Sequence, residues 1–412
     1  MRIGPFSELF GMSPETVRFY VNKGLLVPLI RQGRYIFSPQ DVEDMELLLK
    51  LKALRFSLAE IHRVLSLKRL SNFDSPEELN DYISILKIQK EAMQQEKSHV
   101  EQIIAKLNHE IGHASGKHTG NKRICGVPLV FLPYLACPHC QKGLNISDCN
   151  IEKDQIMAGT LLCSCGYRAQ IQNGIIIGDP GEINAYDGPD LDRYCYRMMS
   201  PPLITLMKKN YQWMLERLGK YDTKGKIILE DFINDYCFCH ANFESMSPDA
   251  LYIVTDKFPE IVAMYKELIE KMNLPHQILY IAAGSHLLPL RKNCIDIYID
   301  SGANECAMFQ PYYSMAALAP YFHSQSRAIG FFWHFAPECL SLQEMKNHYP
   351  NSWEYNFNIR YFQQYLQENW QHIIDFEELG YVTDSGGEDS FSYHIPGEKL
   401  QLQMYFAEKF IK

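Results

Sequence analysis

The sequence predicts a multidomain protein of mixed α and α/β class: a compact helical head, one long helix, a small cysteine-bearing ribbon and a parallel sheet with late antiparallel edge strands. Three observations predict this order. Helix caps follow one another over residues 1–72, paired cysteines lie in the middle of the chain, and strand-like apolar runs alternate with helical ones after residue 190. With 412 residues and 46% hydrophobic content, the chain is long enough for several cores.

The head begins with two helices joined by a tight turn. Helix signals over residues 4–10 and 13–22 flank the turn at Gly11, and Ser13 is expected to be the N-cap of the second helix. This spacing is typical of a helix-turn-helix, whose second helix would present a polar, cationic surface to a DNA major groove or phosphate backbone. Val17 and Val21 are expected on the buried face, and three side chains are expected to project elsewhere: Thr16, Arg18 and Tyr20.

A wing and two further helices complete the head. Residues 25–28 and 31–37 are typical of two extended pieces around Gly33, with arginines at the edge of the wing. Helices are expected from Ser38 to about residue 55 and from Ser57 to about residue 69, each beginning with a capping motif. The domain is therefore expected to span residues 1–72 as a winged helix-turn-helix.

Four motifs of the head occur in a specific order and spacing: Thr16-Val-Arg-Phe-Tyr20, Gly24-Leu-Leu26, Gly33-Arg-Tyr-Ile-Phe37 and Leu54-Arg-Phe-Ser-Leu-Ala-Glu-Ile61. Together they resemble the DNA-binding domain of the MerR family of bacterial transcription regulators. The resemblance implies that the recognition helix binds the operator through Thr16, Arg18 and Tyr20, while wing residues bind phosphate: Arg31, Arg34 and Tyr35. The alternative is that these residues only cap and pack a small helical domain.

The wing departs from the family pattern at one point. The family usually has Gly-Tyr-Arg there, whereas this chain has Gly33-Arg34-Tyr35. The sequence leaves open which of Arg34 and Tyr35 reaches DNA.

Charge is distributed unevenly along the chain. Residues 1–70 hold eleven Lys and Arg against seven Asp and Glu, a balance of +4, so the remainder must carry −13 to give the total of −9. A basic head on an acidic body favours DNA binding at one end only, because phosphate attraction depends on local charge.

The composition also favours a particular compartment. The sequence contains no run of eighteen apolar residues and no cleavable leader, which predicts a cytoplasmic protein without membrane contact. Its twelve cysteines are then expected to be free thiols or metal ligands instead of disulfides.

A long helix is expected over residues 75–112, where apolar residues recur every seven positions: Leu79, Leu86, Met93, Val100 and Leu107. Such a stripe on a charged helix needs a partner. The resemblance implies a coiled coil between two subunits, which would present two heads of a homodimer to a two-fold operator. The alternative is a helix that packs on its own chain. Residues 113–124 are typical of a linker.

A zinc ribbon is expected over residues 125–185. Two cysteine pairs, Cys137 with Cys140 and Cys163 with Cys165, are spaced as two knuckles that would hold a structural tetrahedral Zn²⁺. The segment is poor in core residues, so metal binding is expected to supply most of its folding free energy. His139 is a weaker candidate ligand, and ordinary buried thiols are the alternative.

Residues 190–412 predict a Rossmann-like parallel sheet covered on both faces, with two late strands antiparallel at its edge. This order resembles the class I S-adenosylmethionine methyltransferase fold. The family's glycine-rich cofactor loop is absent after the first strand, where residues 230–238 contain no glycine, and Gly284 stands where the family has an adenine-contacting acidic residue. Asp256 is the one family contact retained, so S-adenosylmethionine binding and methyl transfer are not expected.

A crevice at the carboxyl ends of the strands should persist in such a sheet without the original cofactor. We expect it to hold an unknown small-molecule effector, planar or cationic, because its predicted lining mixes aromatic and acidic side chains. The lining is expected to comprise Glu230, Phe232, Asn234, Tyr236, Asp256, His286, Asp300 and Trp333. Cys237, Cys239 and His240 follow in the same loop and are expected to be packed side chains, since no fourth metal ligand is spaced to join them.

Two functional hypotheses follow. The first is a homodimeric MerR-type regulator that acts with RNA polymerase at a promoter and whose methyltransferase-like domain senses a ligand without catalysis. The second is an active S-adenosylmethionine-dependent methyltransferase with a DNA-binding head. The missing glycines favour the first. A third hypothesis is that residues 190–412 bind another protein instead of a small molecule.

Overall fold

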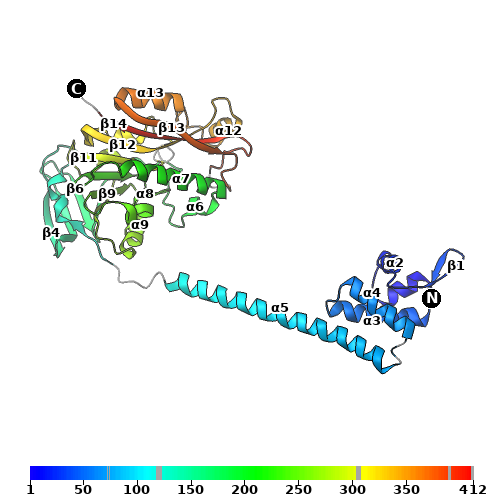
Figure 1. The fold of residues 1–412 in the computed structure, drawn as a ribbon. Helices are drawn as coiled ribbons and strands as arrows, with labels where there is room; N and C mark the ends of the chain where they lie inside the picture. The colour runs from blue at the N-terminus through cyan, green and yellow to red at the C-terminus, as the bar shows by residue number, and fades with distance from the viewer. Residues whose placement is uncertain (72, 74, 117–122, 303–307, 388–390, 410–412) are drawn as a thin grey trace. The chain divides into compact units, whose positions relative to one another are not determined.

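The computed structural model describes residues 1–71, 73, 75–116, 123–302, 308–387 and 391–409. The chain divides into two compact units, Met1–His118 and Thr119–Lys412 (Figure 1). The first unit contains α1 (Ile3–Leu9), α2 (Pro14–Asn22), β1 (Leu29–Arg31), β2 (Arg34–Ile36), α3 (Pro39–Ala53), α4 (Leu58–Ser71) and α5 (Pro76–Gly116). The predicted helix-turn-helix and wing are therefore confirmed as structural elements.

The head's helices begin where their capping residues predict. The Ser13 hydroxyl accepts a hydrogen bond from the backbone N–H of Thr16, and Ser38 forms a complete capping box with Asp41. Ser57 and Glu60 form a second capping box. The Glu60 carboxylate accepts hydrogen bonds from the Ser57 backbone N–H and hydroxyl, and the Ser57 hydroxyl accepts one from the Glu60 N–H. These local bonds satisfy N–H groups that the first turn of a helix leaves open.

Tyr20 corrects one prediction for the recognition helix. It was expected to project away from the apolar face, but it is only 3% exposed and packs in the head core with Val17. The two residues are three positions apart, which places them on one face of a helix. The Tyr20 hydroxyl accepts a hydrogen bond of 3.1 Å from Lys52 Nζ. Tyr20 thus anchors α2 to α3.

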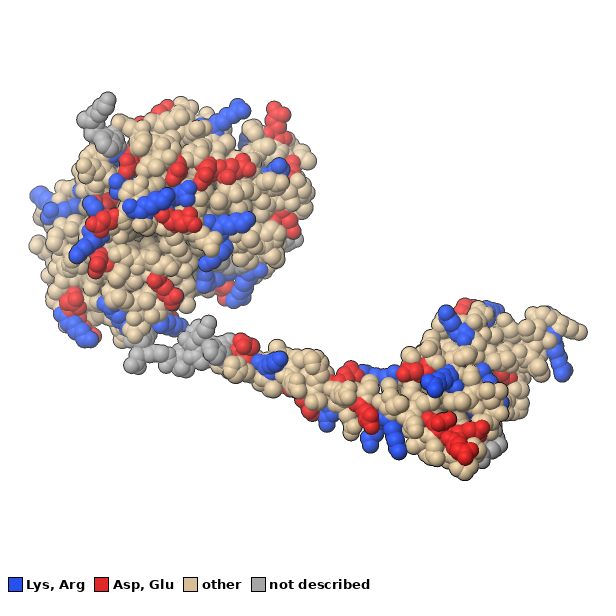
Figure 2. All heavy atoms as spheres, viewed as in Figure 1, with Lys and Arg blue, Asp and Glu red and all other residues tan. Residues whose placement is uncertain are grey.

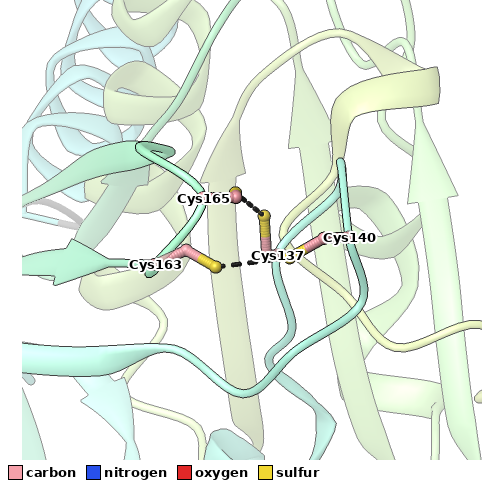
Figure 3. A group of neighbouring side chains, drawn as sticks. All are labelled: Cys137, Cys140, Cys163 and Cys165. Atoms are coloured by element: carbon pink, nitrogen blue, oxygen red, sulfur yellow. Dashed lines mark hydrogen bonds between the residues drawn. The ribbon is translucent and has the colours of Figure 1, made fainter.

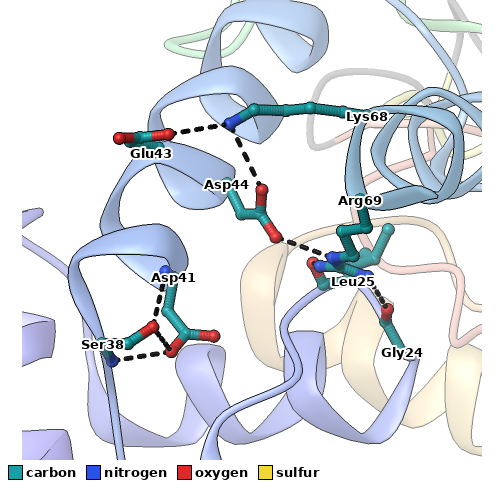
Figure 4. Close-up of polar contacts among 8 residues, drawn as sticks. All are labelled: Gly24, Leu25, Ser38, Asp41, Glu43, Asp44, Lys68 and Arg69. Carbon is teal, nitrogen blue, oxygen red and sulfur yellow. Dashed lines mark hydrogen bonds and ion pairs between the residues drawn. The ribbon is translucent and has the colours of Figure 1, made fainter. Parts of the chain in front are cut away.

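Arg69 of α4 connects a buried carboxylate on α3 with the segment that leads into the wing (Figure 4). Asp44 is 2% exposed, and Arg69 Nε donates to its Oδ2 at 2.7 Å. The same guanidinium donates to the carbonyl oxygens of Gly24 at 3.1 Å and Leu25 at 2.6 Å. Because the Arg69 fork is planar and rigid, it fixes the chain entering the wing against the helix that precedes α5.

The long helix α5 has 41 residues and changes character along its length. Near its start, Tyr82, Ile85 and Leu86 pack against the head core. Further along, five apolar side chains are exposed at helical spacing, and Figure 2 shows mostly uncharged atoms there: Val100, Ile103, Ile104, Leu107 and Ile111. Packing on its own chain therefore accounts only for the first part of α5. The predicted linker at 113–124 begins as helix up to Gly116, and residues 117–122 lie outside the described residues.

The second unit is built on a twelve-stranded sheet. Its strand order is β13-β14-β12-β11-β8-β9-β10-β7-β6-β5-β3, with β4 paired to β5. The strands are β3 (Val127–Pro128), β4 (Asn145–Glu152), β5 (Gln155–Leu162), β6 (Arg168–Gln172), β7 (Ile175–Ile177), β8 (Ile227–Asp231), β9 (Leu251–Asp256), β10 (Gln277–Ala282), β11 (Ile295–Asp300), β12 (Phe322–His334), β13 (His372–Val382) and β14 (Leu400–Glu408). The helical elements are η1 (Leu129–Tyr134), α6 (Tyr194–Met198), α7 (Pro201–Leu218), α8 (Phe238–Asn242), η2 (Phe243–Ser245), α9 (Pro259–Lys271), η3 (Ser285–Leu287), α11 (Ser314–Ala317), η4 (Ala319–Tyr321), α12 (Leu340–His348) and α13 (Ile359–Asn369).

The central strands confirm the predicted Rossmann-like sheet. Strand β8 pairs in parallel with β9 and β11, β9 with β10, and β11 with β12. The late strands β14 and β13 join the edge antiparallel, β14 to β12 and β13 to β14. Alternate residues of a strand face opposite sides, so Ile228 joins one core with α7 and α9 while Ile227 and Leu229 join the other with α13. The sheet is thus covered on both faces.

The ribbon differs from the predicted independent module. Strand β7 pairs in parallel with β10, bringing Ile176 opposite Ile281, so the ribbon strands continue the large sheet. Phe131, Leu161 and Ile171 are buried in the same core as residues of the central strands. The expectation of a segment poor in core residues was wrong, because its apolar residues share one buried core with the central strands.

No described helix of the chain is both long enough and apolar enough to cross a membrane.

Candidate functional site

The exposed surface of α2 and the wing carries cationic side chains. The Arg18 side chain is 54% exposed and lies 3.3 Å from Glu15, one turn earlier on the same helix. Thr16 is half-buried, and its hydroxyl oxygen lies 3.1 Å from that of Ser13. Of the three contacts predicted on this helix, Arg18 is therefore the one whose side chain is exposed.

The wing places its two arginines in solvent. Strands β1 and β2 pair antiparallel with Arg31 opposite Arg34, and the turn between them uses left-handed conformations at Gln32 (φ +50°) and Gly33 (φ +73°). A two-residue turn with two positive φ angles matches the twist of a hairpin, which explains a glycine there. Arg34 is exposed, whereas Tyr35 is half-buried and packs against the head core. At the position where this wing departs from the family, the arginine is thus the accessible side chain.

Four cysteine sulfurs converge between the ribbon's two turns (Figure 3). The Sγ atoms of Cys137 and Cys165 are 3.4 Å apart, as are those of Cys140 and Cys163, and all four lie within 4.8 Å of one another. Four sulfurs at about 2.3 Å from one zinc ion would be roughly 3.8 Å apart. The donor set and spacing therefore fit a closed tetrahedral site, and this cluster could bind a metal.

Local backbone geometry forms both knuckles. Gln141 N–H bonds to the Cys137 carbonyl, and Gly166 N–H bonds to the Cys163 carbonyl. Gly166 has a φ of +97°, which favours glycine at the second turn. His139 is not among the four converging ligands, and its ring contacts Tyr167 at a centroid distance of 5.4 Å.

Cys237, Cys239 and His240 form no comparable cluster among the described residues. Both thiols are 1% exposed, and burial raises the pKa of each well above its ordinary value. Burial also lowers the pKa of His240 to about 4, which keeps the ring neutral. These side chains are packed, as the sequence predicted.

A cavity of about 380 Å³ lies at the carboxyl ends of β8 and β9. Four of the eight predicted lining residues meet there: Phe232, Asn234, Tyr236 and Asp256. His286 lines a neighbouring cavity of about 180 Å³, which shares Phe232 and Lys257 with the first. The position of the 380 Å³ cavity agrees with the rule that open parallel sheets bind ligands at these strand ends.

Asn234 and Asp256 line the cavity and form hydrogen bonds with neighbouring backbone groups. Asp256 accepts hydrogen bonds from the backbone N–H groups of Phe258 at 2.9 Å and Asn234 at 3.1 Å. The Asn234 side chain donates to the Gly188 carbonyl and accepts from the Asp190 N–H, which ties the preceding segment over the strand ends. Burial is the main cause that raises the pKa of Asp256, to about 7.

Three other predicted lining residues lie inside the protein core. Glu230 is fully buried and accepts bonds from the backbone N–H groups of Phe238 and Cys239 and from the Ser301 hydroxyl. Asp300 is 2% exposed and accepts a 2.7 Å bond from the Tyr405 hydroxyl. Trp333 is fully buried. The prediction that these three line the cavity was wrong, because the Glu230 carboxylate binds the start of α8, the Asp300 carboxylate binds Tyr405 of β14, and the Trp333 indole is buried in the core.

The loop after β8 carries bulky side chains where the resembled family has glycines. Phe232 adopts a left-handed backbone conformation (φ +58°), which is strained for a residue with a bulky side chain. The Tyr236 ring is 1% exposed and lies so close to Gly302 that a Cβ added there would be 2.9 Å from the ring. These residues do not fit the glycine-lined cofactor seat of the methyltransferases that the sequence resembles.

Sequence reasoning missed several residues that line the cavity. They come from the segment that leads into α6 and from the chain after β8, β9, β11, α12 and β13: Tyr186, Asp187, Asp190, Tyr194, Asp235, Lys257, Phe258, Met308, Phe309, Tyr349 and Phe391. Lys257 follows the retained acidic residue directly and was within reach of sequence reasoning. The loop residues carry no periodic signal that could have placed them.

Comparisons with known proteins give different relatives for the N-terminal head and for the rest of the chain. Residues 1–68 match the model of the MerR HTH family regulatory proteins. Among solved structures, the chain is similar to HiNmlR, a MerR family regulator lacking the sensor domain, bound to promoter DNA: identity is 21%, coverage is 28% of this chain and 90% of that one, and the TM-score is 0.22. A putative MerR family transcriptional regulator from Listeria monocytogenes is also 21% identical, with 28% and 86% covered and a TM-score of 0.22.

Methyltransferases are among the other similar structures. A putative sarcosine dimethylglycine methyltransferase from Galdieria sulphuraria is 11% identical, with 54% of this chain and 98% of that one covered and a TM-score of 0.41. No curated protein matches the sequence. The family match and the observed strand order together show that residues 1–68 form a MerR-type helix-turn-helix domain on the same chain as a domain with a methyltransferase-like fold.

Proposed function

We propose that this protein is a homodimeric transcription regulator of MerR type that binds double-stranded promoter DNA and acts there with RNA polymerase. The observation that carries the proposal is the match of residues 1–68 to the MerR HTH family, combined with exposed arginines on α2 and the wing. In such a domain the recognition helix enters the major groove while the wing lies along the backbone. Thr16, Arg18, Arg31 and Arg34 are the proposed contacts. The proposal places the protein in the cytoplasm, where promoter DNA lies.

The C-terminal domain is proposed to bind a small effector and not to transfer methyl groups. The buried Tyr236 ring against Gly302 and the strained Phe232 support this, since both occupy the loop where a donor would need close backbone approach. The cavity beside that loop supplies a place for a different ligand. Zinc is proposed as the metal of the four-cysteine cluster, because four thiolates in a closed tetrahedron are its structural ligand set.

The exposed stripe on α5 supports dimerisation. Ile103, Ile104 and Leu107 are 43%, 50% and 57% exposed and lie on one side of the helix. Because each side chain is already about half buried, burying the rest of it against a second copy would contribute about 1 kcal/mol. Two heads joined in this way would match a two-fold operator.

The experiment that tests this proposal combines association state with DNA binding. In the double variant Ile104→Glu/Leu107→Glu, the dimer should dissociate roughly 100-fold or more easily, because two charges enter the apolar seam of each chain. Sedimentation equilibrium of the full chain measures this. A gel shift with the promoter upstream of its own gene should show the same variant binding far more weakly than the parent.

The matched control is Ser98→Glu/Gln102→Glu, which adds the same charges to exposed positions on the opposite side of α5. It should leave both the dimer and the gel shift unchanged. A parent chain that sediments as a monomer would contradict the dimer. No retarded band with parent protein at low ionic strength would contradict the regulator itself.

A further inference from the structure

The cavity at the carboxyl ends of β8 and β9 has an aromatic wall built from three distant segments. Tyr186 stacks on Phe309 with ring centroids 4.9 Å apart and an interplanar angle of 12°. Tyr349 meets both rings edge-on, at 5.2 Å from Tyr186 and 5.7 Å from Phe309. Tyr186 is nevertheless 56% exposed. A large aromatic surface is therefore held in place and left accessible beside the cavity.

The charged groups lining the same cavity are mainly acidic. Among the described residues, its lining contains four aspartates and one cationic side chain, Lys257. Lys257 forms an ion pair with Asp187, in which both side chains are about nine-tenths buried. The one positive charge of the lining is thus already matched by a carboxylate, and three further carboxylates line the cavity: Asp190, Asp235 and Asp256.

These features select against some ligands and favour others. An anion such as a phosphate or a simple carboxylate would meet several carboxylates and no unmatched cationic group of the lining. A cation gains from both features, because aromatic faces carry negative charge density and the carboxylates add Coulomb attraction. Asp256 contributes less to this attraction than an exposed carboxylate would, because burial raises its pKa to about 7; a bound cation would favour its ionised form.

We propose that the effector bound in this cavity is a compact organic cation, a quaternary ammonium or protonated amine on an apolar or aromatic body. Its charged head would lie against the Tyr186, Phe309 and Tyr349 rings and toward the aspartates. A cavity of about 380 Å³ suits a molecule of this kind. The inference rests on the proposed function of the sheet domain as a ligand sensor and names the chemistry of that ligand.

Isothermal titration calorimetry of the full chain tests the inference with three probes of similar shape. They are benzyltrimethylammonium, the neutral 2-methyl-1-phenylpropan-2-ol and the anionic phenylacetate. We expect saturable binding of the cation at least tenfold tighter than that of the neutral alcohol, and none for phenylacetate. Equal affinity for cation and alcohol, tighter binding of phenylacetate, or no saturable heat with the cation would each overturn the inference.

A variant locates the binding. Tyr349→Leu keeps an apolar side chain and removes one aromatic face, so it should weaken benzyltrimethylammonium binding by roughly 2- to 30-fold. The control is Tyr381→Leu, at an exposed tyrosine on β13 outside the cavity. Matching melting temperatures would show that both variants fold. If both variants bind the cation like the parent, this cavity is not the site and the inference is wrong.

The DNA-binding readout separates this inference from the proposed function. If the parent binds promoter DNA but not the cation, the ligand chemistry is wrong while the regulator stands. If the cation binds saturably but no DNA is bound, the inference holds for the domain and the regulator is wrong.

Discussion

Arg18→Ala is expected to weaken promoter-DNA binding of the proposed dimer by roughly 10- to 100-fold, since removing one cationic side chain from each of two heads costs about 1–3 kcal/mol in total. The Arg18 side chain is 54% exposed, on the recognition helix, and its neighbour Glu15 restrains it only through a solvated pair. Removing Arg31 and Arg34 from the wing should weaken binding further. Fluorescence anisotropy at several salt concentrations measures both effects.

The salt dependence of DNA binding distinguishes contacts to phosphate from contacts to base edges. Each phosphate-binding side chain that is removed should reduce the slope of log K against log salt concentration by about 1. The wing variants should therefore flatten the slope, and Arg18→Ala should also reduce discrimination between operator and random duplex if the side chain reaches base edges.

The matched control is Arg168→Ala, which removes the same charge from an exposed position on β6 of the body. It should leave affinity and slope unchanged. Equally weakened binding in Arg168→Ala and Arg18→Ala would mean that total charge, and not the recognition helix, governs binding.

Cys163→Ser is expected to weaken zinc binding by roughly 10²- to 10³-fold, because one of four ligands supplies about a quarter of the 10–16 kcal/mol typical of structural zinc sites. The four sulfurs already lie within 4.8 Å of one another, so little rearrangement is needed to surround an ion. Mass spectrometry of the purified chain should find about one zinc per parent chain and much less in the variant. Cys149→Ser, at an exposed cysteine outside the cluster, should keep the metal.

The fold of the body should survive removal of the metal. Ribbon residues such as Phe131 and Leu161 share a core with the central strands, and β7 is paired with β10. Circular dichroism of the chelated protein should therefore retain the sheet signal, with the change confined to the two knuckles. Global unfolding on chelation would show that the metal, and not the shared core, holds the ribbon.

The head was predictable because its signals are local. Ser13, Ser38 and Ser57 cap helices through bonds to residues only three positions away, so the sequence itself specifies where each helix begins. The three-residue spacing of Tyr20 from Val17 puts both on one face of α2, so the burial of Tyr20 was also predictable. Only its hydrogen bond to Lys52 of α3 depends on the tertiary fold.

The sheet was predictable in type and order, but the ribbon's place in it was not. Alternation of strands and helices predicts parallel pairing, and the late strands proved antiparallel as expected. The pairing of β7 with β10 joins segments about one hundred residues apart, and no local pattern encodes such a pairing. The ribbon therefore looked independent when it is an extension of the larger sheet.

The cavity was only half predictable. Phe232, Asn234 and Tyr236 follow a strand end, and parallel topology brings that end to the ligand-binding edge. Glu230 and Asp300 end strands at the same edge, but their carboxylates turn inward to backbone N–H and hydroxyl donors. Tyr186, Phe309 and Tyr349 come from loops whose positions depend on the tertiary fold, so the aromatic wall had no signature in the sequence.

We propose that the MerR-type domain shares its chain with a methyltransferase-like domain whose loop after β8 does not accept the methyl donor. Calorimetric titration of S-adenosylmethionine into the full chain tests it most directly. No saturable heat is expected up to millimolar concentration, because the Tyr236 ring against Gly302 and the side chain of Phe232 occupy the loop. Micromolar binding accompanied by methyl transfer to nucleic acid would contradict the claim.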